Sequence, residues 1–281
     1  MSQDITVKVP ATSANIGSGF DALGLALSLY NEVSFRKTDE GGLSLVIEGL
    51  GQGKITTDFE RNLVGQAMLR AALVNGKALP ENGVITLFNR IPLARGLGSS
   101  SAAVVGGLLL GNELTGRGMD ENQILHEATL MEGHPDNAAP ALLGGLCMSV
   151  TDEKKKVSVQ TFALDEDLSF ITVSPDKEVR TADARAVLPQ TIVAHVALLV
   201  GAFIGKRYDL LRTGLQDKLH MPYRLPLIPG GAEALAAAEK AGAVGATVSG
   251  SGSTLIAFAV KGEEQIAQAM KDVFKSVGLA S

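Results

Sequence analysis

The chain runs Pro92-Leu93-Ala94-Arg95-Gly96-Leu97-Gly98-Ser99-Ser100-Ser101-Ala102 where a predicted strand gives way to a predicted helix. Gly96 and Gly98 free the backbone, so that consecutive N–H groups can point inward. Three serines add hydroxyl groups at the start of the helix, whose N-terminus carries about half a positive charge and stabilises an anion. Helix capping would explain a single serine. Three serines after Gly-Leu-Gly favour a phosphate-binding loop.

Two other glycine-rich segments compete for this role. Residues 49–54, Gly-Leu-Gly-Gln-Gly-Lys, look like a P-loop but are one residue short, and Ile55 stands where Ser or Thr is needed. We interpret them as a surface turn. Residues 249–254, Ser-Gly-Ser-Gly-Ser-Thr, lie between two predicted strands, where phosphate binding and a flexible hairpin turn are equally good interpretations.

Acidic and histidine side chains follow a predicted helix at residues 124–131. The stretch is Glu132-Gly133-His134-Pro135-Asp136-Asn137. Mg²⁺ takes one or two carboxylates together with phosphate oxygens, so Glu132 or Asp136 could serve phosphoryl transfer. A zinc site is disfavoured, because the helical histidine pair typical of such sites is missing. We expect Pro135 and Pro140 to keep the segment after Gly133 irregular.

Composition excludes several classes of protein. The chain has 281 residues, 46% of them hydrophobic and 20% charged, which is typical of a globular protein with ample material for a core. A net charge of −5, 4% aromatic residues and no tryptophan argue against a nucleic-acid partner. Cys147 is the single cysteine, which excludes an internal disulfide and fits a reducing compartment. The longest apolar stretch, residues 192–205, is shorter than the roughly 20 residues that span a membrane, so we expect a buried helix and no membrane partner.

Strand and helix patterns alternate along the chain. Ile5, Val7 and Val9 alternate with polar residues and predict a strand that Pro10 ends. Residues 62–74 and 101–114 predict helices, whereas 32–37, 43–48 and 84–88 predict strands. The polar stretch 151–156 marks either a domain boundary or a long hairpin turn. The second half is mixed, and it ends in the order helix, strand, strand, helix.

Three motifs in this order resemble the GHMP kinases, a family of ATP-dependent small-molecule kinases. Residues 92–102 match the family's ATP-phosphate loop, residues 9–21 resemble its N-terminal motif, and residues 249–254 resemble its C-terminal glycine motif. The resemblance covers essentially the whole chain. Residues 132–137, 180–189 and 222–224 are similar to the branch of the family that phosphorylates homoserine. Ser18 and Ser253 stand where many relatives have proline, so we expect somewhat looser turns there.

The resemblance implies an α+β fold of two domains. The first, residues 1–153, would be a ribosomal-protein-type βαβ domain that binds ATP, and the second, residues 154–281, would be ferredoxin-like. ATP and substrate are expected to meet in the cleft between them. The implied enzyme uses ATP and Mg²⁺, phosphorylates the side-chain hydroxyl of L-homoserine for threonine synthesis, and is cytoplasmic. Family members are often homodimers, so a dimer is also expected.

The resemblance also assigns site residues. ATP is expected at Asn62, which would contact adenine, and along Pro92, Leu93, Ala94, Arg95, Gly96, Leu97, Gly98, Ser99, Ser100, Ser101 and Ala102. Ser100, with Ser99 as the alternative, and Glu132 would hold Mg²⁺. Homoserine is expected among Asn15, Asp21, His134, Asp136, Asn137, Thr181, Arg185, Arg224 and Gly252. Asp21, Asp136 and Asn137 are the catalytic candidates, and whether Asp136 acts as a base is left open.

The chemistry of an amino-acid substrate agrees with these assignments. Arginine binds a carboxylate with two parallel hydrogen bonds, which suits Arg185 and Arg224. Asp21 and the amide oxygen of Asn15 suit an ammonium group. Two alternatives stay open. A relative that phosphorylates a mevalonate-type acid would bind no ammonium, and a non-catalytic regulator would lack the phosphate loop or the Mg²⁺ carboxylate.

Overall fold

The computed structural model describes residues 4–151, 155–175, 195–217 and 219–281, which fall into two units. The first unit comprises Met1–Thr12, Ala26–Leu93 and Gly98–Gln160, and the second comprises Ser13–Leu25, Ala94–Leu97 and Thr161–Ser281. Each unit is therefore assembled from several stretches of chain. The single boundary between residues 153 and 154 stays a prediction.

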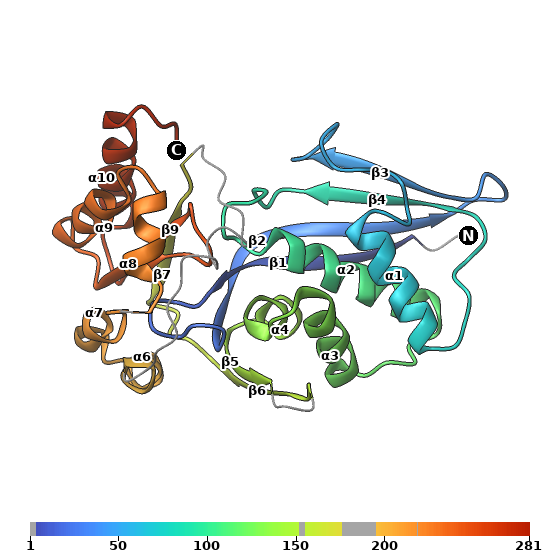
Figure 1. The fold of residues 1–281 in the computed structure, drawn as a ribbon, viewed down its shortest axis with the longest axis horizontal. Helices are drawn as coiled ribbons and strands as arrows, with labels where there is room; N and C mark the ends of the chain where they lie inside the picture. The colour runs from blue at the N-terminus through green and yellow to red at the C-terminus, as the bar shows by residue number, and fades with distance from the viewer. Residues whose placement is uncertain (1–3, 152–154, 176–194, 218) are drawn as a thin grey trace. The chain divides into compact units, whose positions relative to one another are not determined.

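A six-stranded sheet forms the framework of the first unit (Figure 1). Its strands are β1 (Ile5–Ala14), β2 (Leu23–Lys37), β3 (Leu43–Gly49), β4 (Gly83–Asn89), β5 (Leu146–Thr151) and β6 (Val157–Phe162). The order is β3-β4-β2-β5-β6, with β1 paired to β2. Strand β4 pairs antiparallel with β2 and parallel with β3. The mixture of helices and sheets confirms the expected α+β class.

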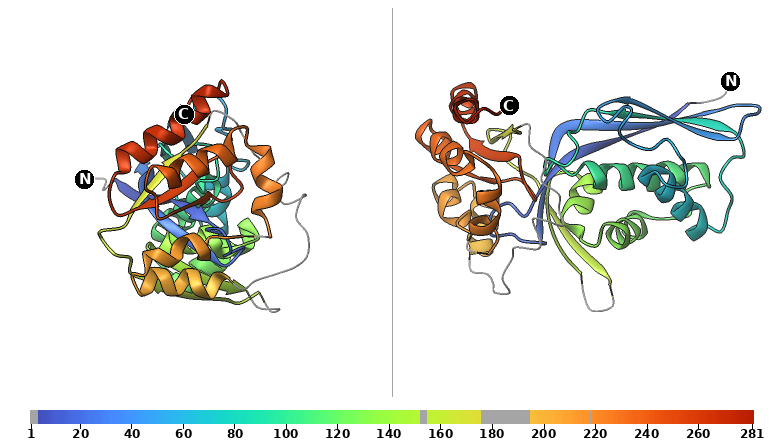
Figure 2. Two further views of the ribbon diagram at one scale, coloured as in Figure 1. Left: turned by 90° about the vertical axis from the view of Figure 1, so that its left-hand side faces the viewer. Right: turned by 45° about the horizontal axis from the view of Figure 1, so that its top comes forward.

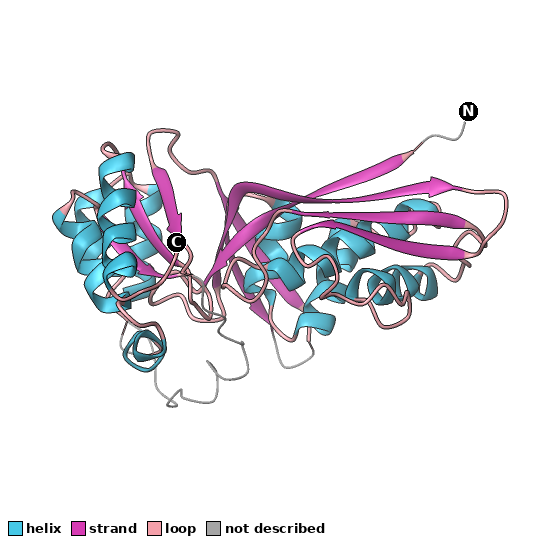
Figure 3. Cartoon of the chain, turned by 90° about the horizontal axis from the view of Figure 1, so that it is seen from above, coloured by secondary structure: helices cyan, strands magenta, loops and turns pink. Residues whose placement is uncertain are grey.

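Helices cover one face of this sheet (Figures 1 and 3). They are α1 (Leu63–Val74), α2 (Ser99–Leu114), α3 (Glu121–Glu132) and α4 (Pro135–Leu143). Alternate residues of each strand point to the helices because side chains alternate along a strand. The core contains Phe35, Ile47 and Ile85 from the strands, with Met68 from α1 and Leu110 from α2. This packing fixes the position of the α2 N-terminus.

Two predictions about the first unit are wrong at prolines. Strand β1 continues through Pro10 to Ala14, which is possible because β1 lies off the main path of the sheet and a strand in such a position tolerates a missing N–H. The segment after Gly133 is helical rather than irregular. Pro135 is the first residue of α4, where the absent N–H is not needed, and Pro140 is accommodated inside the helix.

The second unit contains a three-stranded antiparallel sheet in the order β7-β9-β8. Its strands are β7 (Ser169–Val173), β8 (Gly245–Val248) and β9 (Leu255–Ala259), and its longer helices are α6 (His195–Ile204), α9 (Gly231–Lys240) and α10 (Glu263–Ser276). Short helical segments connect them: η1 (Tyr208–Leu210), α7 (Leu211–Gly214), α8 (Met221–Arg224) and η2 (Leu225–Leu227). In the described parts of the chain, no helix is both long and apolar enough to cross a membrane.

Helices lie on both faces of this smaller sheet. Ala257 of β9 belongs to the same buried cluster as Ile266, Met270 and Phe274, which are the buried residues of α10. Helices α9 and α10 belong to the orange-to-red part of the chain in Figure 2. The neighbouring Phe258 points to the opposite face and meets Phe203 of α6, with the ring centroids 5.6 Å apart. The segments 15–22 and 249–254, both in the second unit, carry some of the residues predicted for the site.

Candidate active site

The residue before α2 provides no side-chain cap. Gly98 precedes the helix with a φ of 68° and has no side chain that could bond the first N–H groups. Ala94 and Gly96 also have positive φ values, 52° and 76°. The resulting turn leaves the first N–H groups of a 16-residue helix available to an anion. The sequence therefore predicted the position of this helix end correctly.

Small residues hold α2 close against α1. A Cβ atom added to Gly107 would lie 2.5 Å from the carbonyl oxygen of Val64, and one added to Gly111 would lie 2.8 Å from the Cα of Met68. Both distances are shorter than a real Cβ contact, so only glycine allows this approach. The helix that presents the phosphate loop is thus fixed by its own backbone against a neighbour.

Glu132 ends α3 beside the serines of the loop. Its Oε2 accepts a hydrogen bond from the Ser100 hydroxyl at 3.1 Å and another from the Ser101 hydroxyl. A carboxylate and hydroxyl oxygens are hard ligands of the kind Mg²⁺ prefers. Ser101 is fully buried and Ser100 is exposed, so Ser100 is the hydroxyl that a ligand can reach. The donor set fits the expected metal.

The first turn of α4 brings three predicted residues together. Nδ1 of His134 lies 2.5 Å from Oδ1 of Asp136, whose residue is only 2% exposed. Oδ1 of Asn137 accepts from the Thr12 hydroxyl at 2.7 Å. A Cβ on Gly98 would lie 2.0 Å from Oγ1 of Thr12 and 3.1 Å from Oδ1 of Asn137. The start of α4 therefore adjoins the start of α2.

Asn62 occupies a structural position. It is the N-cap of α1, where its Oδ1 accepts from the N–H of Val64 at 2.9 Å. Its Nδ2 donates to the carbonyl oxygen of Thr56 at 2.7 Å. Both ends of the amide are thus engaged within the first unit, and the residue is 3% exposed. The adenine contact expected for Asn62 stays a prediction.

In the second unit, a loop of unusual backbone carries Asn15 and Asp21. We call residues 15–21 the substrate loop. Asn15, Ile16 and Asp21 have positive φ values of 68°, 43° and 54°, which residues with side chains rarely adopt. Oδ1 of Asn15 accepts from the backbone N–H of Asp21 at 3.0 Å. This bond closes the loop and places the two polar residues at its ends together.

Arg224 lies inside the second unit, 2% exposed. Its Nη1 donates to the carbonyl oxygen of Gly250 at 2.9 Å, and its Cζ is 5.5 Å from the centroid of the Phe20 ring. A guanidinium over an aromatic face is a favourable cation–π arrangement. The structure thus brings Arg224 to the substrate loop and to the glycine motif, which also contains Gly252.

The glycine motif at 249–254 contacts the centre of the phosphate loop within the second unit. The Ser249 hydroxyl donates to the carbonyl oxygen of Gly96 at 2.8 Å, and the N–H of Thr254 donates to the carbonyl oxygen of Arg95 at 3.0 Å. A Cβ on Gly96 would lie only 2.1 Å from the carbonyl oxygen of Ser249. The motif is a buried support for the loop rather than a flexible hairpin turn.

Ser18 and Ser253, the departures from the family pattern, are both held in place. Ser18 is 7% exposed and donates to the carbonyl oxygen of Gly214 at 2.8 Å. The Ser253 hydroxyl is fully buried and lies 3.5 Å from the carbonyl oxygen of Pro175. Looser turns were expected because serine lacks the ring of proline. In both serines the hydroxyl bonds a backbone carbonyl oxygen, which the side chain of proline could not do.

Thr181 and Arg185 lie outside the described residues. Three further residues, not predicted from the sequence, contact the predicted site residues or their loops: Thr12, Phe20 and His220. Thr12 and Phe20 belong to the N-terminal motif, and His220 lies two residues before the Pro-Tyr-Arg stretch at 222–224. Only their positions within or beside a motif could have identified these residues, because their residue types do not indicate ligand binding.

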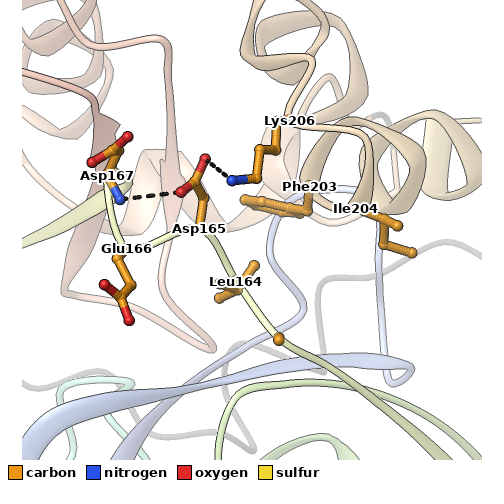
Figure 4. Close-up of a pocket in the computed structure, with 8 residues that line it drawn as sticks. Leu164, Asp165, Glu166, Asp167, Phe203, Ile204 and Lys206 are labelled. Atoms are coloured by element: carbon orange, nitrogen blue, oxygen red, sulfur yellow. Dashed lines mark hydrogen bonds and ion pairs between the residues drawn. The ribbon is translucent and has the colours of Figure 1, made fainter.

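A separate cavity of about 460 Å³ lies in the second unit (Figure 4). Asp165, at its wall, is 3.0 Å from Nζ of Lys206 and accepts from the Tyr208 hydroxyl at 2.7 Å. These bonds lower the pKa of Asp165, with the Tyr208 bond as the largest cause. Burial and the Asp165 carboxylate raise the pKa of Tyr208 to about 12. None of the predicted site residues that the structure describes lines this cavity.

Models of two protein families match the chain. The GHMP kinases N-terminal domain matches residues 62–145, and the GHMP kinases C-terminal domain matches residues 199–276. The first match contains α1, the phosphate loop and the start of α4. The second contains Arg224 and the glycine motif.

Curated relatives match over nearly the full length. A homoserine kinase from Carboxydothermus hydrogenoformans is 43% identical over 98% of this chain and 91% of its own. A homoserine kinase from Desulfitobacterium hafniense is 41% identical over 99% of this chain and 95% of its own. Among solved structures, homoserine kinase from Cytophaga hutchinsonii has a TM-score of 0.88 and 32% identity, covering 100% of this chain and 93% of that one.

Proposed function

The chain belongs to the homoserine kinases of the GHMP kinase family, and we propose that it transfers the γ-phosphate of ATP to the side-chain hydroxyl of L-homoserine. The observation that carries the proposal is the uncapped N-terminus of α2 with Ser100 and Glu132 beside it. Phosphate needs N–H donors, and its metal needs hard oxygen ligands. Both lie within one unit of this chain.

The phosphate groups of ATP would bind at the first N–H groups of α2. Both glycines of this loop are required, because a side chain at Gly96 would collide with Ser249 and one at Gly98 would collide with Thr12. Ser100 and Glu132 would hold Mg²⁺, which supplies positive charge against the phosphate oxygens. Glu132 would then exchange its bonds to the two serine hydroxyls for a bond to the metal. The remaining residues of 92–102 would follow the phosphates.

Asp136 is the proposed acceptor of the hydroxyl proton. As the substrate oxygen bonds to the γ-phosphorus, the bond to the β-γ bridging oxygen breaks, ADP leaves, and the proton passes to the Asp136 carboxylate. His134 holds Oδ1 of that carboxylate, which leaves Oδ2 for the substrate. Asn137, anchored by Thr12, would orient the hydroxyl. Such reactions pass through a loose transition state, so positioning contributes most of the acceleration.

The carboxylate and the ammonium of the amino-acid substrate need binding groups of opposite charge. Arg224 would pair with the carboxylate, and Asp21 with the amide oxygen of Asn15 would accept hydrogen bonds from the ammonium. Gly252 would allow close approach of the backbone, with its φ of 88°. Thr181 and Arg185 remain predicted members of this set. A mevalonate-type acid would leave the ammonium partners unsatisfied, which favours homoserine.

Two properties stay predictions drawn from the family. One is assembly into a homodimer. The other is location in the cytoplasm, and the single cysteine, Cys147, is consistent with that reducing compartment. Neither is needed for the reaction proposed above.

A coupled assay of ADP release tests the function. The purified protein is incubated with Mg-ATP and with each of L-homoserine, D-homoserine, L-serine, L-threonine and mevalonate. We expect release with L-homoserine well above the others. Release with mevalonate alone would keep the phosphate site but overturn the proposed substrate. Absence of release with all five alcohols, despite tight ATP binding, would favour a regulator over a kinase.

Asp136→Asn separates proton transfer from binding. The amide keeps the shape of the side chain but cannot accept the proton. We expect kcat to fall while the KM for homoserine stays unchanged. Near-normal turnover in this variant would show that the Asp136 carboxylate is not the base.

A further inference from the structure

The substrate loop is held in a conformation that it would not adopt alone. Besides Asn15, Ile16 and Asp21, Gly17 has a positive φ of 67°. Such a backbone persists only where surrounding structure determines it. Two of the bonds that surround this loop come from the segment before Arg224 in the same unit, since Gly214 accepts from Ser18 and His220 bonds Gly17.

His220 makes the central contact of this segment. The residue has no exposed surface, and its Nε2 lies 2.7 Å from the carbonyl oxygen of Gly17. A carbonyl oxygen can only accept, so Nε2 carries the proton and donates it. The bond joins the middle of the substrate loop to the residue that precedes α8.

The ring of His220 also packs in a stack that leads to Arg224. Its centroid is 5.7 Å from that of Phe20, with the planes tilted by 41°. Phe20 in turn lies under the guanidinium of Arg224. Phe20 belongs to the substrate loop, so one imidazole touches the element carrying Asn15 and Asp21 and supports the ring beneath Arg224.

The other nitrogen of the imidazole faces Asp217. Nδ1 lies 3.8 Å from Oδ2 of Asp217, which accepts from the backbone N–H groups of His220 at 2.7 Å and Met221 at 2.6 Å. Burial lowers the pKa of His220, while Asp217 opposes that shift. Arg224 also lowers it, and Asp21 raises it. The neutral ring with its proton on Nε2 is therefore the form that holds Gly17.

We propose that His220 is a positioning residue for substrate recognition. Its bond to Gly17 and its contact with Phe20 place the substrate loop and Arg224 where they can bind the ammonium and the carboxylate of an amino acid. The inference rests on the proposed function and assigns to it a residue that does not touch the substrate. Loss of His220 should weaken homoserine binding and leave ATP binding intact.

Two substitutions separate the hydrogen bond from the volume of the ring. In His220→Gln the amide Nε2 lies about as far from the Cα atom as the imidazole Nε2 does, so the hydrogen-bond donor to Gly17 is kept. In His220→Asn the amide reaches only as far as Nδ1, and the donor is lost. Tyr208→Phe is the matched control, because it removes a hydroxyl bond to Asp165 in the same unit.

The first measurement is steady-state kinetics with both substrates. In His220→Asn we expect the KM for homoserine to rise about tenfold, since a buried acceptor is left unsatisfied. The KM for ATP should not change. His220→Gln should restore most of the homoserine affinity, and Tyr208→Phe should match the wild type. An unchanged homoserine KM in His220→Asn, or an equal rise for both substrates, would overturn the proposal.

The second measurement is amide hydrogen exchange without substrate. The N–H of Asn15 donates to the carbonyl oxygen of Leu23 at the start of β2, and the N–H of Asp21 donates to Oδ1 of Asn15. They should exchange faster in His220→Asn and at the wild-type rate in His220→Gln. Equal exchange in all variants would overturn the positioning role. This readout needs no activity, so it is distinct from a failure of the wild type to phosphorylate homoserine, which would overturn the proposed function itself.

Discussion

The start of α2 and the substrate loop offer their proposed ligands different groups. The first presents backbone N–H groups at the end of a 16-residue helix, fixed against α1 by glycines. The second presents the side chains of Asn15 and Asp21 on a loop whose Ser18 and Gly17 bond Gly214 and His220. A backbone site depends on glycine, whereas a side-chain site can change its ligand by a few substitutions. On the proposed function, substitutions in the substrate loop would therefore change the acceptor alcohol while the phosphate site stays the same.

The largest effect is expected at Glu132. Glu132→Gln keeps the shape of the side chain but removes the charge that would hold Mg²⁺. We expect kcat to fall about a thousandfold, the upper range for loss of one electrostatic contact in an active site. Steady-state rates at saturating Mg-ATP measure it.

Glu113→Gln is the matched control for this variant. Glu113 lies near the end of α2 and pairs with Arg117 at 2.7 Å on the surface, away from the helix start. Its loss should leave kcat unchanged. Wild-type turnover in Glu132→Gln would remove Glu132 from the phosphate site.

Gly98→Ala should have the next largest effect. The new methyl group would collide with Thr12 while the backbone is in a left-handed conformation, so the loop must shift. We expect kcat/KM for ATP to fall about a hundredfold, because small misplacements of reacting groups are costly.

Gly53→Ala provides the comparison for Gly98→Ala. Gly53 has a similar φ of 73°, but a Cβ there would meet nothing within 4 Å. It lies in the segment 49–54 that resembles a P-loop. Near-normal ATP kinetics in Gly53→Ala would confirm the interpretation as a surface turn, and a loss equal to that of Gly98→Ala would contradict it.

Arg224→Lys addresses the side-chain region. Lysine keeps the charge but loses the planar fork, so we expect the KM for homoserine to rise about thirtyfold, since hydrogen bonds to charged groups contribute about 2 kcal/mol. The KM for ATP should be unchanged. L-homoserine amide lacks the carboxylate, so the variant and the wild type should process it equally. A comparable loss with the amide would mean that Arg224 acts through structure alone.

A smaller effect concerns pH and His220. Burial lowers the pKa of His220 below its ordinary 6.5, so below that pH the unfolded state binds more protons than the folded state. Stability is therefore lost as the pH falls from about 6.5 toward the lowered pKa. Between pH 7 and pH 5 the Tm of the wild type should fall about 3 °C more than that of His220→Gln. Parallel Tm curves for the two proteins would contradict the assignment.

The smallest effect is expected at Cys147. It is fully buried in β5, and burial raises the pKa of its thiol to about 12, so little thiolate exists at neutral pH. Thiol reagents should modify the native protein slowly and leave its activity intact, as mass spectrometry and rate assays would show. Rapid labelling would mean that the first unit opens more readily than its packing implies.

The two regions also differ in what the sequence could predict. The turn that leads into α2 could be predicted because Gly96, Gly98 and three serines act through local chemistry, and phosphate binding there stays a prediction. Helix α4 was missed because proline was interpreted as a breaker without regard to its place in the first turn. Much of β2 was missed although leucine recurs at every second position from 23 to 29, which is the alternation of a strand. The link from His220 to Gly17 joins residues 203 positions apart, and no local pattern reports it.

Transfer of phosphate from ATP to the homoserine hydroxyl can be observed by ³¹P nuclear magnetic resonance of the reaction with Mg-ATP and L-homoserine. We expect ADP and a phosphomonoester whose phosphorus couples to the side-chain methylene protons of homoserine. Formation of inorganic phosphate alone, or no change in ATP, would contradict it.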